Sequence, residues 1–151
     1  MKALFAGSFD PFTIGHLDIT KRALKIFDEL IIGIGHNDNK KSFWDADQRL
    51  NIIKEIFNAD PRIDVKVFTG LTVKFARQEG AQVLVRGIRS NIDFEFEKNL
   101  ADINKELSGI ETVLLIAEPK YEFVSSSMIR ELIVNGYNPS KYLCGNWPLN
   151  I

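Results

Sequence analysis

The sequence predicts a single α/β domain with a parallel sheet of five strands. Short apolar runs alternate along the chain with segments of helical periodicity, and strands separated by helices form parallel sheets through right-handed crossovers. Residues 29–35 (ELIIGIG) form a continuous apolar run, which is typical of a strand covered on both faces. The 151 residues are the size of one ordinary domain. No repeat, linker or low-complexity stretch divides them, so we expect one Rossmann-like, doubly wound domain over residues 1–151.

The first half of the chain is expected to contain three strands and two helices. The strands are the apolar runs at residues 2–6, 29–35 and 63–68. A helix is expected at residues 15–28, because apolar side chains recur there at intervals of four, three and four residues, as one buried stripe requires. That stripe consists of Ile19, Ala23, Ile26 and Leu30. The second helix is expected to begin with a capping box and to continue with apolar residues at helical period. These residues are Asp45 and Gln48, followed by Leu50, Ile53 and Phe57.

The second half is expected to continue the alternation. A short helix at residues 71–79 is stopped by Gly80, and strands at residues 82–86 and 112–117 flank a long helix at residues 91–107. The apolar side chains of that long helix are expected to face inward; they are Phe96, Leu100, Ile103 and Leu107. Serine is a favoured N-cap, so the three serines Ser125–Ser127 are expected to cap a last helix that extends to about Asn135.

The composition is typical of a globular protein and excludes several classes. Hydrophobic residues make up 45% of the chain and charged residues 26%. With 19 Lys and Arg against 20 Asp and Glu, the net charge is −1, which favours neither nucleic acid nor an acidic membrane as a partner. The single cysteine, Cys144, excludes an internal disulfide and a cysteine-built zinc site. No apolar run approaches the roughly 18 residues that span a bilayer, and no signal-like segment opens the chain. We therefore expect a cytoplasmic location.

Cationic side chains and histidines gather where the expected strands end. The first strand leads into the turn GSFDPFTIGH at residues 7–16, and backbone N–H groups at such a turn and helix start lack internal partners. In a parallel sheet, ligands lie at the carboxyl ends of the strands. Four of the five strand ends carry a cation or a histidine, namely His16, then His36, Lys40 and Lys41, then Arg86 and Arg89, then Lys120. This edge of the sheet suits a polyanionic ligand such as a nucleoside triphosphate.

Several familiar phosphate and hydrolase motifs are missing. The P-loop pattern G-x-x-x-x-G-K-[ST] does not occur, which argues against a P-loop kinase or NTPase. Gly33-Ile34-Gly35 begins a dinucleotide-like pattern, but Asp38 stands where the third glycine belongs. The nucleophile elbow G-x-S-x-G of Ser-His-Asp hydrolases is also missing.

Two other motifs match the nucleotidylyltransferase superfamily. Thr13-Ile14-Gly15-His16 matches its [H/T]-x-G-H signature, and residues 126–130 (SSMIR) match Ser-Ser-x-x-[I/L]-[R/K]. Within that superfamily the chain resembles the phosphopantetheine adenylyltransferase family over nearly its whole length. The most specific match is Arg86-Gly87-Ile88-Arg89 followed by Asp93-Phe94-Glu95.

The resemblance implies a reaction between ATP and 4′-phosphopantetheine that gives dephospho-coenzyme A and pyrophosphate. The acceptor phosphate is already an anionic nucleophile, so the enzyme must supply in-line positioning and charge neutralisation rather than a base. His16 would stabilise the transition state, with Lys40 and Arg89 as further catalytic residues. Mg²⁺ would bridge the ATP phosphates with few protein ligands, and no protein metal ligands are expected. The resemblance also implies a homohexamer.

The resemblance further implies two sets of binding residues. The ATP-binding set is Ser8, Phe9, His16, Gly87, Ile88, Arg89, Glu97, Tyr121, Glu122, Phe123, Val124, Ser125, Ser126 and Ser127. The set for phosphopantetheine is Ser8, Lys40, Thr72 and Arg86. The chain departs from the common family pattern at Thr72, where Met or Leu is frequent, and a backbone amide could serve there whatever the side chain.

Structural roles and other functions remain open alternatives. His16 and the serines could cap helices, and Arg86 and Arg89 could pair with Asp93 or Glu97. A mononucleotide adenylyltransferase or a cytidylyltransferase of the same superfamily is one alternative function, although both usually carry His at position 13. Cytidylyltransferases also carry an Arg-Thr-x-Gly-Ile-Ser-Thr-Thr stretch that is missing here. A nucleotide sensor without catalysis is the other alternative, and it would be expected to lack His16 or an arginine.

Overall fold

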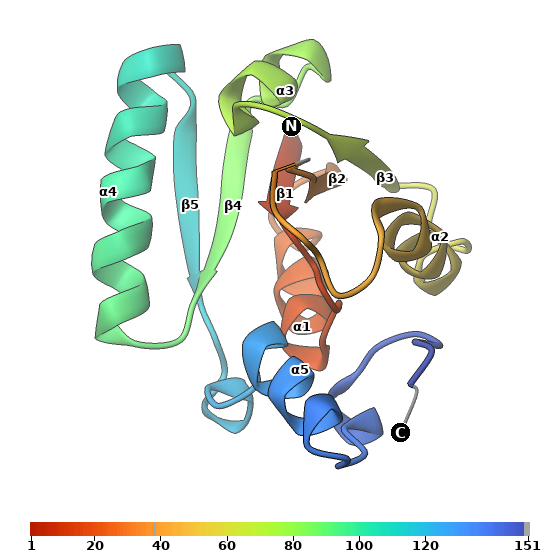
Figure 1. Cartoon of the computed structure of the whole chain (residues 1–151). Coiled ribbons are helices and arrows are strands. Elements are labelled where there is room, and N and C mark those ends of the chain that lie inside the picture. Colours follow the sequence, from red (N-terminus) through yellow and green to blue (C-terminus); the bar gives the residue numbers. More distant parts are fainter. Residues whose placement is uncertain (38, 150–151) are drawn as a thin grey trace.

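The computed structural model describes residues 1–37 and 39–149, which form a five-stranded sheet between helices (Figure 1). Every strand pair is parallel, and the strand order is β3-β2-β1-β4-β5. The strands are β1 (Lys2–Gly7), β2 (Glu29–Gly35), β3 (Ile63–Phe68), β4 (Val83–Ile88) and β5 (Glu111–Ile116). The order reverses between β1 and β4, which is the switch point where open α/β sheets bind ligands. The expected doubly wound α/β domain is confirmed.

Helices cover both faces of this sheet. They are α1 (Ile14–Ala23), α2 (Ala46–Ile56), α3 (Thr72–Gln78), α4 (Asn91–Ser108) and α5 (Ser126–Val134), with short 3₁₀ turns η1 (Pro119–Tyr121) and η2 (Ser140–Tyr142). Alternate residues of β1 enter different clusters, because successive strand side chains point to opposite faces. Ala3 and Phe5 pack with residues of α1, α2 and α5, whereas Leu4 and Ala6 pack with residues of α3. The central strands are therefore buried on both sides, as their apolar runs predicted.

The first helix is shorter than expected. The strands lie within two residues of their predicted bounds, but α1 ends at Ala23 rather than near residue 28. Lys25 and Ile26 donate their N–H groups to carbonyls three residues back, and this tighter turn changes which side chains face the core. Phe27 is buried and Ile26 is 59% exposed. The prediction that Ile26 belongs to the buried stripe was wrong.

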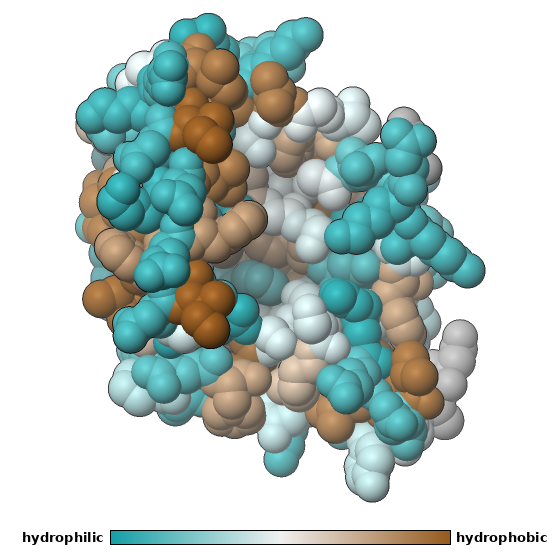
Figure 2. Space-filling view, turned by 60° about the vertical axis from the view of Figure 1, so that its left-hand side comes forward, coloured by the Kyte–Doolittle hydropathy of each residue, from teal (hydrophilic) through white to brown (hydrophobic). Residues whose placement is uncertain are grey.

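The inward face expected of the long helix α4 was wrong for three of its four residues, and only Leu100 is half-buried. Phe96, Ile103 and Leu107 are all more than half exposed, and Glu97 is the buried residue of the helix. Figure 2 shows hydrophobic side chains on the surface of this side of the molecule, next to a hollow. The helix turns Glu97 inward because that carboxylate pairs with Arg86 of β4, and the apolar side chains are thereby directed outward.

Within residues 1–37 and 39–149, no helix has both the length and the apolar character needed to cross a membrane.

Candidate active site

The segment between β1 and α1 forms the floor of the site. Phe9 has a φ of 46°, a left-handed conformation that a bulky residue rarely adopts, and its side chain is buried. Backbone strain of this kind persists only where the surrounding structure enforces it, and it is frequent at functional sites. The buried ring of Phe9 thus holds the turn in place beneath the carboxyl end of β1.

His16 is held at the first turn of α1 by a capping box with Thr13. Thr13 is the N-cap: its Oγ1 accepts from the backbone N–H of His16 at 3.2 Å, and its own N–H donates to His16 Nδ1 at 3.0 Å. The ring also lies among aromatic side chains, with its centroid 5.0 Å from Phe9 and 5.3 Å from Phe12. The capping role foreseen as an alternative for His16 is therefore real, and it orients the ring.

This contact also determines where the imidazole carries its proton. A backbone N–H can only donate, so Nδ1 of His16 must be the acceptor. Burial, followed by the positive charges of Arg89 and Arg86, lowers the pKa of His16 from 6.5 to about 3. The ring is therefore neutral near pH 7, with its one N–H at Nε2. His16 can donate one hydrogen bond from Nε2 to an anion.

The two arginines at the end of β4 are both ion-paired with α4. Arg86 donates from Nε and Nη2 to the carboxylate of Glu97 at 2.7 and 2.6 Å, and from Nη1 to the carbonyl of Ala6. Arg89 donates to Asp93 at 3.0 Å. The ion-pair alternative for these arginines is thus confirmed. Each guanidinium has donors on several edges, so pairing fixes its orientation and still permits contact with a ligand.

The N-terminus of α5 lies against the segment between β1 and α1, although the two are more than 110 residues apart in the chain. Ser125 is the N-cap and accepts from the N–H of Met128 at 3.0 Å. Ser126 Oγ donates to the carbonyl of Pro11 at 2.8 Å, and Arg130 Nη1 donates to the carbonyl of Asp10 at 2.6 Å. The two sequence motifs are therefore parts of one site, and its helix N-terminus favours an anion.

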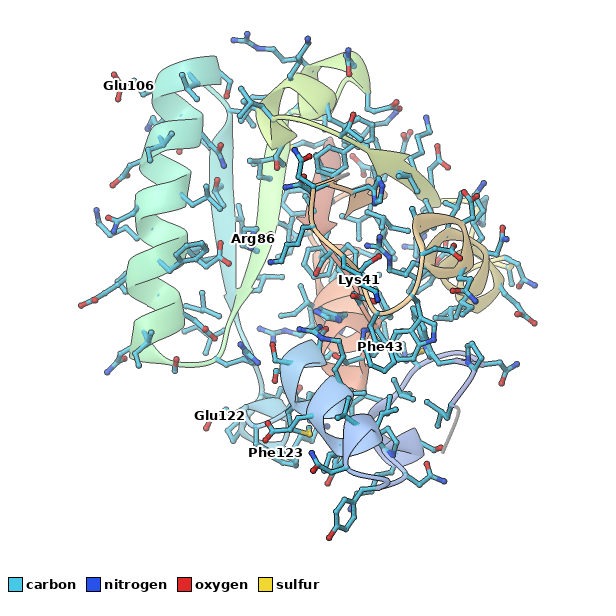
Figure 3. The ribbon with its side chains drawn as sticks, viewed as in Figure 1. Lys41, Phe43, Arg86, Glu106, Glu122 and Phe123 are labelled. Atoms are coloured by element: carbon cyan, nitrogen blue, oxygen red, sulfur yellow. The ribbon has the colours of Figure 1, made fainter. Side chains whose placement is uncertain are left out.

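Two cavities of about 840 and 270 Å³ meet above the end of β1. Ala6, Gly7, Ser8 and Arg86 line both. All four residues predicted to bind phosphopantetheine line the larger cavity: Ser8, Lys40, Thr72 and Arg86. Lys41, labelled in Figure 3 with Arg86, lines it as well.

Most of the predicted ATP-binding residues line the smaller cavity. They are Ser8, Phe9, His16, Gly87, Arg89, Glu97, Tyr121, Val124, Ser125, Ser126 and Ser127. Ile88 lines neither cavity and is buried. Glu122 and Phe123 also line neither; they follow η1 at the surface (Figure 3). Of the three predicted catalytic residues, His16 and Arg89 line the smaller cavity and Lys40 the larger.

Sequence reasoning missed three charged residues of the larger cavity. Asp10, Arg49 and Arg130 all line it. Asp10 and Arg130 lie inside motifs that were recognised, so a role for them could have been considered. Arg49 follows the start of α2 in a segment with ordinary helical periodicity, and no pattern in the sequence distinguished it from a surface arginine.

Comparison with known proteins places the chain in a family. The cytidylyltransferase-like family model matches residues 4–132. A phosphopantetheine adenylyltransferase of Porphyromonas gingivalis is 52% identical over 141 residues, which cover 93% of this chain and 92% of that protein. One of Phocaeicola vulgatus is 48% identical and covers 94% of each chain.

Solved structures of low sequence identity share the fold. A bifunctional NMN adenylyltransferase/ADP ribose pyrophosphatase from Francisella tularensis matches 97% of this chain and 46% of its own, with a TM-score of 0.74 and 16% identity. The same kind of protein complexed with AMP and a manganese ion gives a TM-score of 0.68 over 97% of this chain and 45% of its own, at 18% identity. These matches show the fold, whereas the family model and the sequence relatives show that the chain belongs to the cytidylyltransferase-like family and, within it, to the phosphopantetheine adenylyltransferases.

Proposed function

We propose that this protein transfers the adenylyl group of ATP to 4′-phosphopantetheine, forming dephospho-coenzyme A and pyrophosphate for coenzyme A synthesis in the cytoplasm. The observation that carries the proposal is the pair of cavities that meet at Ala6, Gly7, Ser8 and Arg86. A transfer between two substrates needs two binding sites whose reacting ends adjoin. The names of the close relatives supply the identity of the acceptor.

The larger cavity is suited to the acceptor. Lys40, Lys41 and Arg86 line it and can neutralise the phosphate of phosphopantetheine. Phe43 and Phe68 line it too, and their rings offer apolar surface to the pantetheine arm. In the smaller cavity, the N-terminus of α5 and the side chain of Arg89 face the place proposed for the ATP phosphates.

The reaction then needs no base. An oxygen of the acceptor phosphate forms a bond to the α-phosphorus of ATP. The bond from that phosphorus to the oxygen bridging toward the β-phosphorus breaks, and pyrophosphate leaves with the electron pair. His16 donates from Nε2 to a non-bridging α-phosphate oxygen, where negative charge accumulates in the transition state. Arg89 and Lys40 add positive charge from the two sides of the junction.

We also propose that Mg²⁺ enters with ATP. In the described part of the chain, no three His, Cys, Asp or Glu side chains are grouped in a way that could hold a metal ion. We therefore expect an ion that takes most of its ligands from the ATP phosphates and water, as Mg²⁺ commonly does. When bound, the ion would neutralise part of the triphosphate charge, and Arg86 and Arg89 would remain to orient the reactants.

Pyrophosphate release tests the proposed function. Purified protein with ATP and Mg²⁺ is expected to release pyrophosphate when 4′-phosphopantetheine is added and to release none without it. Nicotinamide mononucleotide with ATP, and phosphocholine with CTP, serve as competing acceptors. Release that depends on either of these, and not on phosphopantetheine, would assign the site to another member of the superfamily. No release with any acceptor, together with ATP binding in calorimetry, would indicate a sensor.

A further inference from the structure

Two buried charges in the wall of the larger cavity have no part in the mechanism above. Asp10 follows Phe9 in the turn between β1 and α1, and Arg49 lies in the first half of α2. Asp10 is 6% exposed and Arg49 only 1%. Burying a charge costs several kcal/mol unless other groups compensate for the lost water. The hydrogen-bond partners that compensate these two buried charges therefore indicate the role of each side chain.

The carboxylate of Asp10 holds the chain just before α2. Its Oδ2 accepts from the N–H of Phe43 at 2.7 Å, and its Oδ1 accepts from the N–H of Trp44 at 2.9 Å. A carboxylate that accepts two backbone N–H groups makes charge-assisted hydrogen bonds, which are stronger than neutral ones. Asp10 thus connects the turn after β1 to the peptide at residues 43–44.

Arg49 holds the same residue, Trp44, through its carbonyl group. Its Nε donates to the carbonyl of Trp44 at 3.0 Å, and its Nη1 donates to the carbonyls of Ser8 at 2.6 Å and Gly35 at 3.4 Å. Burial lowers the pKa of Arg49, and the negative charges of Asp10 and Asp45 oppose that effect. One guanidinium therefore connects the ends of β1 and β2 to the start of α2.

These contacts fix both flanks of the segment that carries the lysines. Lys40 and Lys41 lie between Gly35, whose carbonyl binds Arg49, and Phe43, whose N–H binds Asp10. Ser8, one of the four residues that line both cavities, is attached to the same guanidinium through its carbonyl oxygen. The position of the two lysines relative to the junction is thus coupled to Asp10 and Arg49.

We propose that Asp10 and Arg49 are positioning residues that place Lys40 and Lys41 for the acceptor phosphate. The inference rests on the proposed function, since it concerns the acceptor side of that reaction. Neither side chain needs to touch the substrate. Their loss is expected to weaken use of the acceptor, whereas ATP binds on the other side of the junction and is affected less.

The test compares Arg49→Lys and Asp10→Asn with wild type. Lysine keeps the positive charge but lacks the planar fork that reaches two carbonyls at once. Asparagine keeps the shape of Asp10 but retains only one acceptor oxygen. The matched controls are Arg62→Lys and Asp60→Asn, an exposed ion pair between α2 and β3 with a 2.7 Å contact. For each protein we would measure kcat, KM for phosphopantetheine, KM for ATP and Tm.

We expect KM for phosphopantetheine to rise about tenfold or more in both site variants, with KM for ATP changing less than about twofold. The control pair should change neither. Equal changes in both KM values, or a loss of activity that only follows Tm, would overturn the inference and leave Asp10 and Arg49 as structural residues. If Arg49→Lys does not fold, the two KM values of Asp10→Asn alone decide whether the inference holds. A wild-type protein that ignores phosphopantetheine would instead refute the proposed function.

A double-mutant cycle with Lys40→Ala isolates the route of the effect. If Arg49 acts through the lysines, Arg49→Lys should raise KM for phosphopantetheine much less in the Lys40→Ala background than in wild type, because residues that act together are not additive. Fully additive changes, or a Lys40→Ala protein with unchanged KM, would contradict the proposed coupling.

Discussion

At the scale of single residues, one contact of His16 both completes the capping box of α1 and determines which ring nitrogen carries the proton. The N–H of Thr13 that completes the capping box also occupies Nδ1, and the proton of the neutral ring is therefore on Nε2. The motif Thr-x-Gly-His thus supplies a helix start and an oriented donor together. Neither role excludes the other, and the sequence alone could not choose between them.

Replacement of His16 tests the donor role. We expect His16→Ala to lower kcat by roughly 10²–10³-fold, as for removal of one preorganised transition-state donor. KM for both substrates should change little, because the donor acts mainly in the transition state. His16→Gln places an amide N–H near the position of Nε2 and should retain more activity than His16→Ala. Steady-state kinetics of pyrophosphate release measure this, and a His16→Ala protein with wild-type kcat would remove His16 from the mechanism.

The low pKa of His16 also predicts how stability depends on pH. The unfolded chain protonates His16 near pH 6.5 and the folded protein only near pH 3, so between these values the unfolded state binds more protons. The stabilisation from His16 is therefore complete above pH 6.5 and is lost as the pH falls toward 3. At pH 5 the loss amounts to about 2 kcal/mol. Urea unfolding of wild type and His16→Gln at pH 5 and 7.5 measures the difference. An equal pH dependence in both proteins would contradict the assigned pKa.

At the scale of elements, α4 serves the site through its buried carboxylate. Glu97 orients Arg86, which lines both cavities. We expect Glu97→Gln to reduce the free energy of unfolding by about 1–3 kcal/mol, because one partner of a largely buried pair is removed. Since Arg86 lines both cavities, we expect KM to rise for ATP and for phosphopantetheine.

A control for Glu97 is available on the same helix. Asp102 pairs with Lys98 on the exposed side of α4 at 2.8 Å, and exposed pairs of this kind contribute about 0.5 kcal/mol or less. Asp102→Asn should therefore leave stability and both KM values near wild type. Chemical denaturation and steady-state kinetics of the two variants give the comparison, and equal behaviour would show that Glu97 has no special role.

The same helix shows where prediction from sequence succeeds and where it fails. The central strands β1, β2 and β4 were predicted well because their apolar runs are largely buried and can be recognised without knowledge of a partner. The inward face of α4 was predicted wrongly because Glu97 is buried through an ion pair with Arg86, a residue of another element. Hydrophobic periodicity contains no information about such a pair. Arg49 escaped notice for the same reason, since its partners are carbonyl groups of distant segments.

At the scale of the whole molecule, the topology explains why the site itself could be predicted. The order β3-β2-β1-β4-β5 places the ends of β2 and β4 on either side of β1. Residues from the second and fourth strand ends, such as Lys40 and Arg89, thereby flank the turn that carries Ser8. Recognising parallel strands was enough to expect this convergence. The division into two cavities required the side-chain positions, which no sequence pattern supplies.

The surface of the molecule leads to a last prediction, which concerns assembly. Phe96, Ile103 and Leu107 leave α4 with an exposed apolar side (Figure 2), and contiguous apolar patches on soluble proteins commonly mark interaction sites. We propose that copies of this chain meet there in the expected hexamer, so that wild type should have a mass six times the 17.2 kDa of one chain.

Substitution of this apolar side tests that assignment. The double variant Phe96→Ser, Ile103→Ser should dissociate into smaller species, because an interface core that loses two large apolar side chains loses several kcal/mol of burial. Val134→Ser is the matched control, since Val134 is 75% exposed but lies on α5, and it should leave the mass unchanged. Light scattering coupled to size-exclusion chromatography measures both. A double variant that keeps the wild-type mass would show that the interface does not lie on this side of α4, and a monomeric wild type would refute the hexamer.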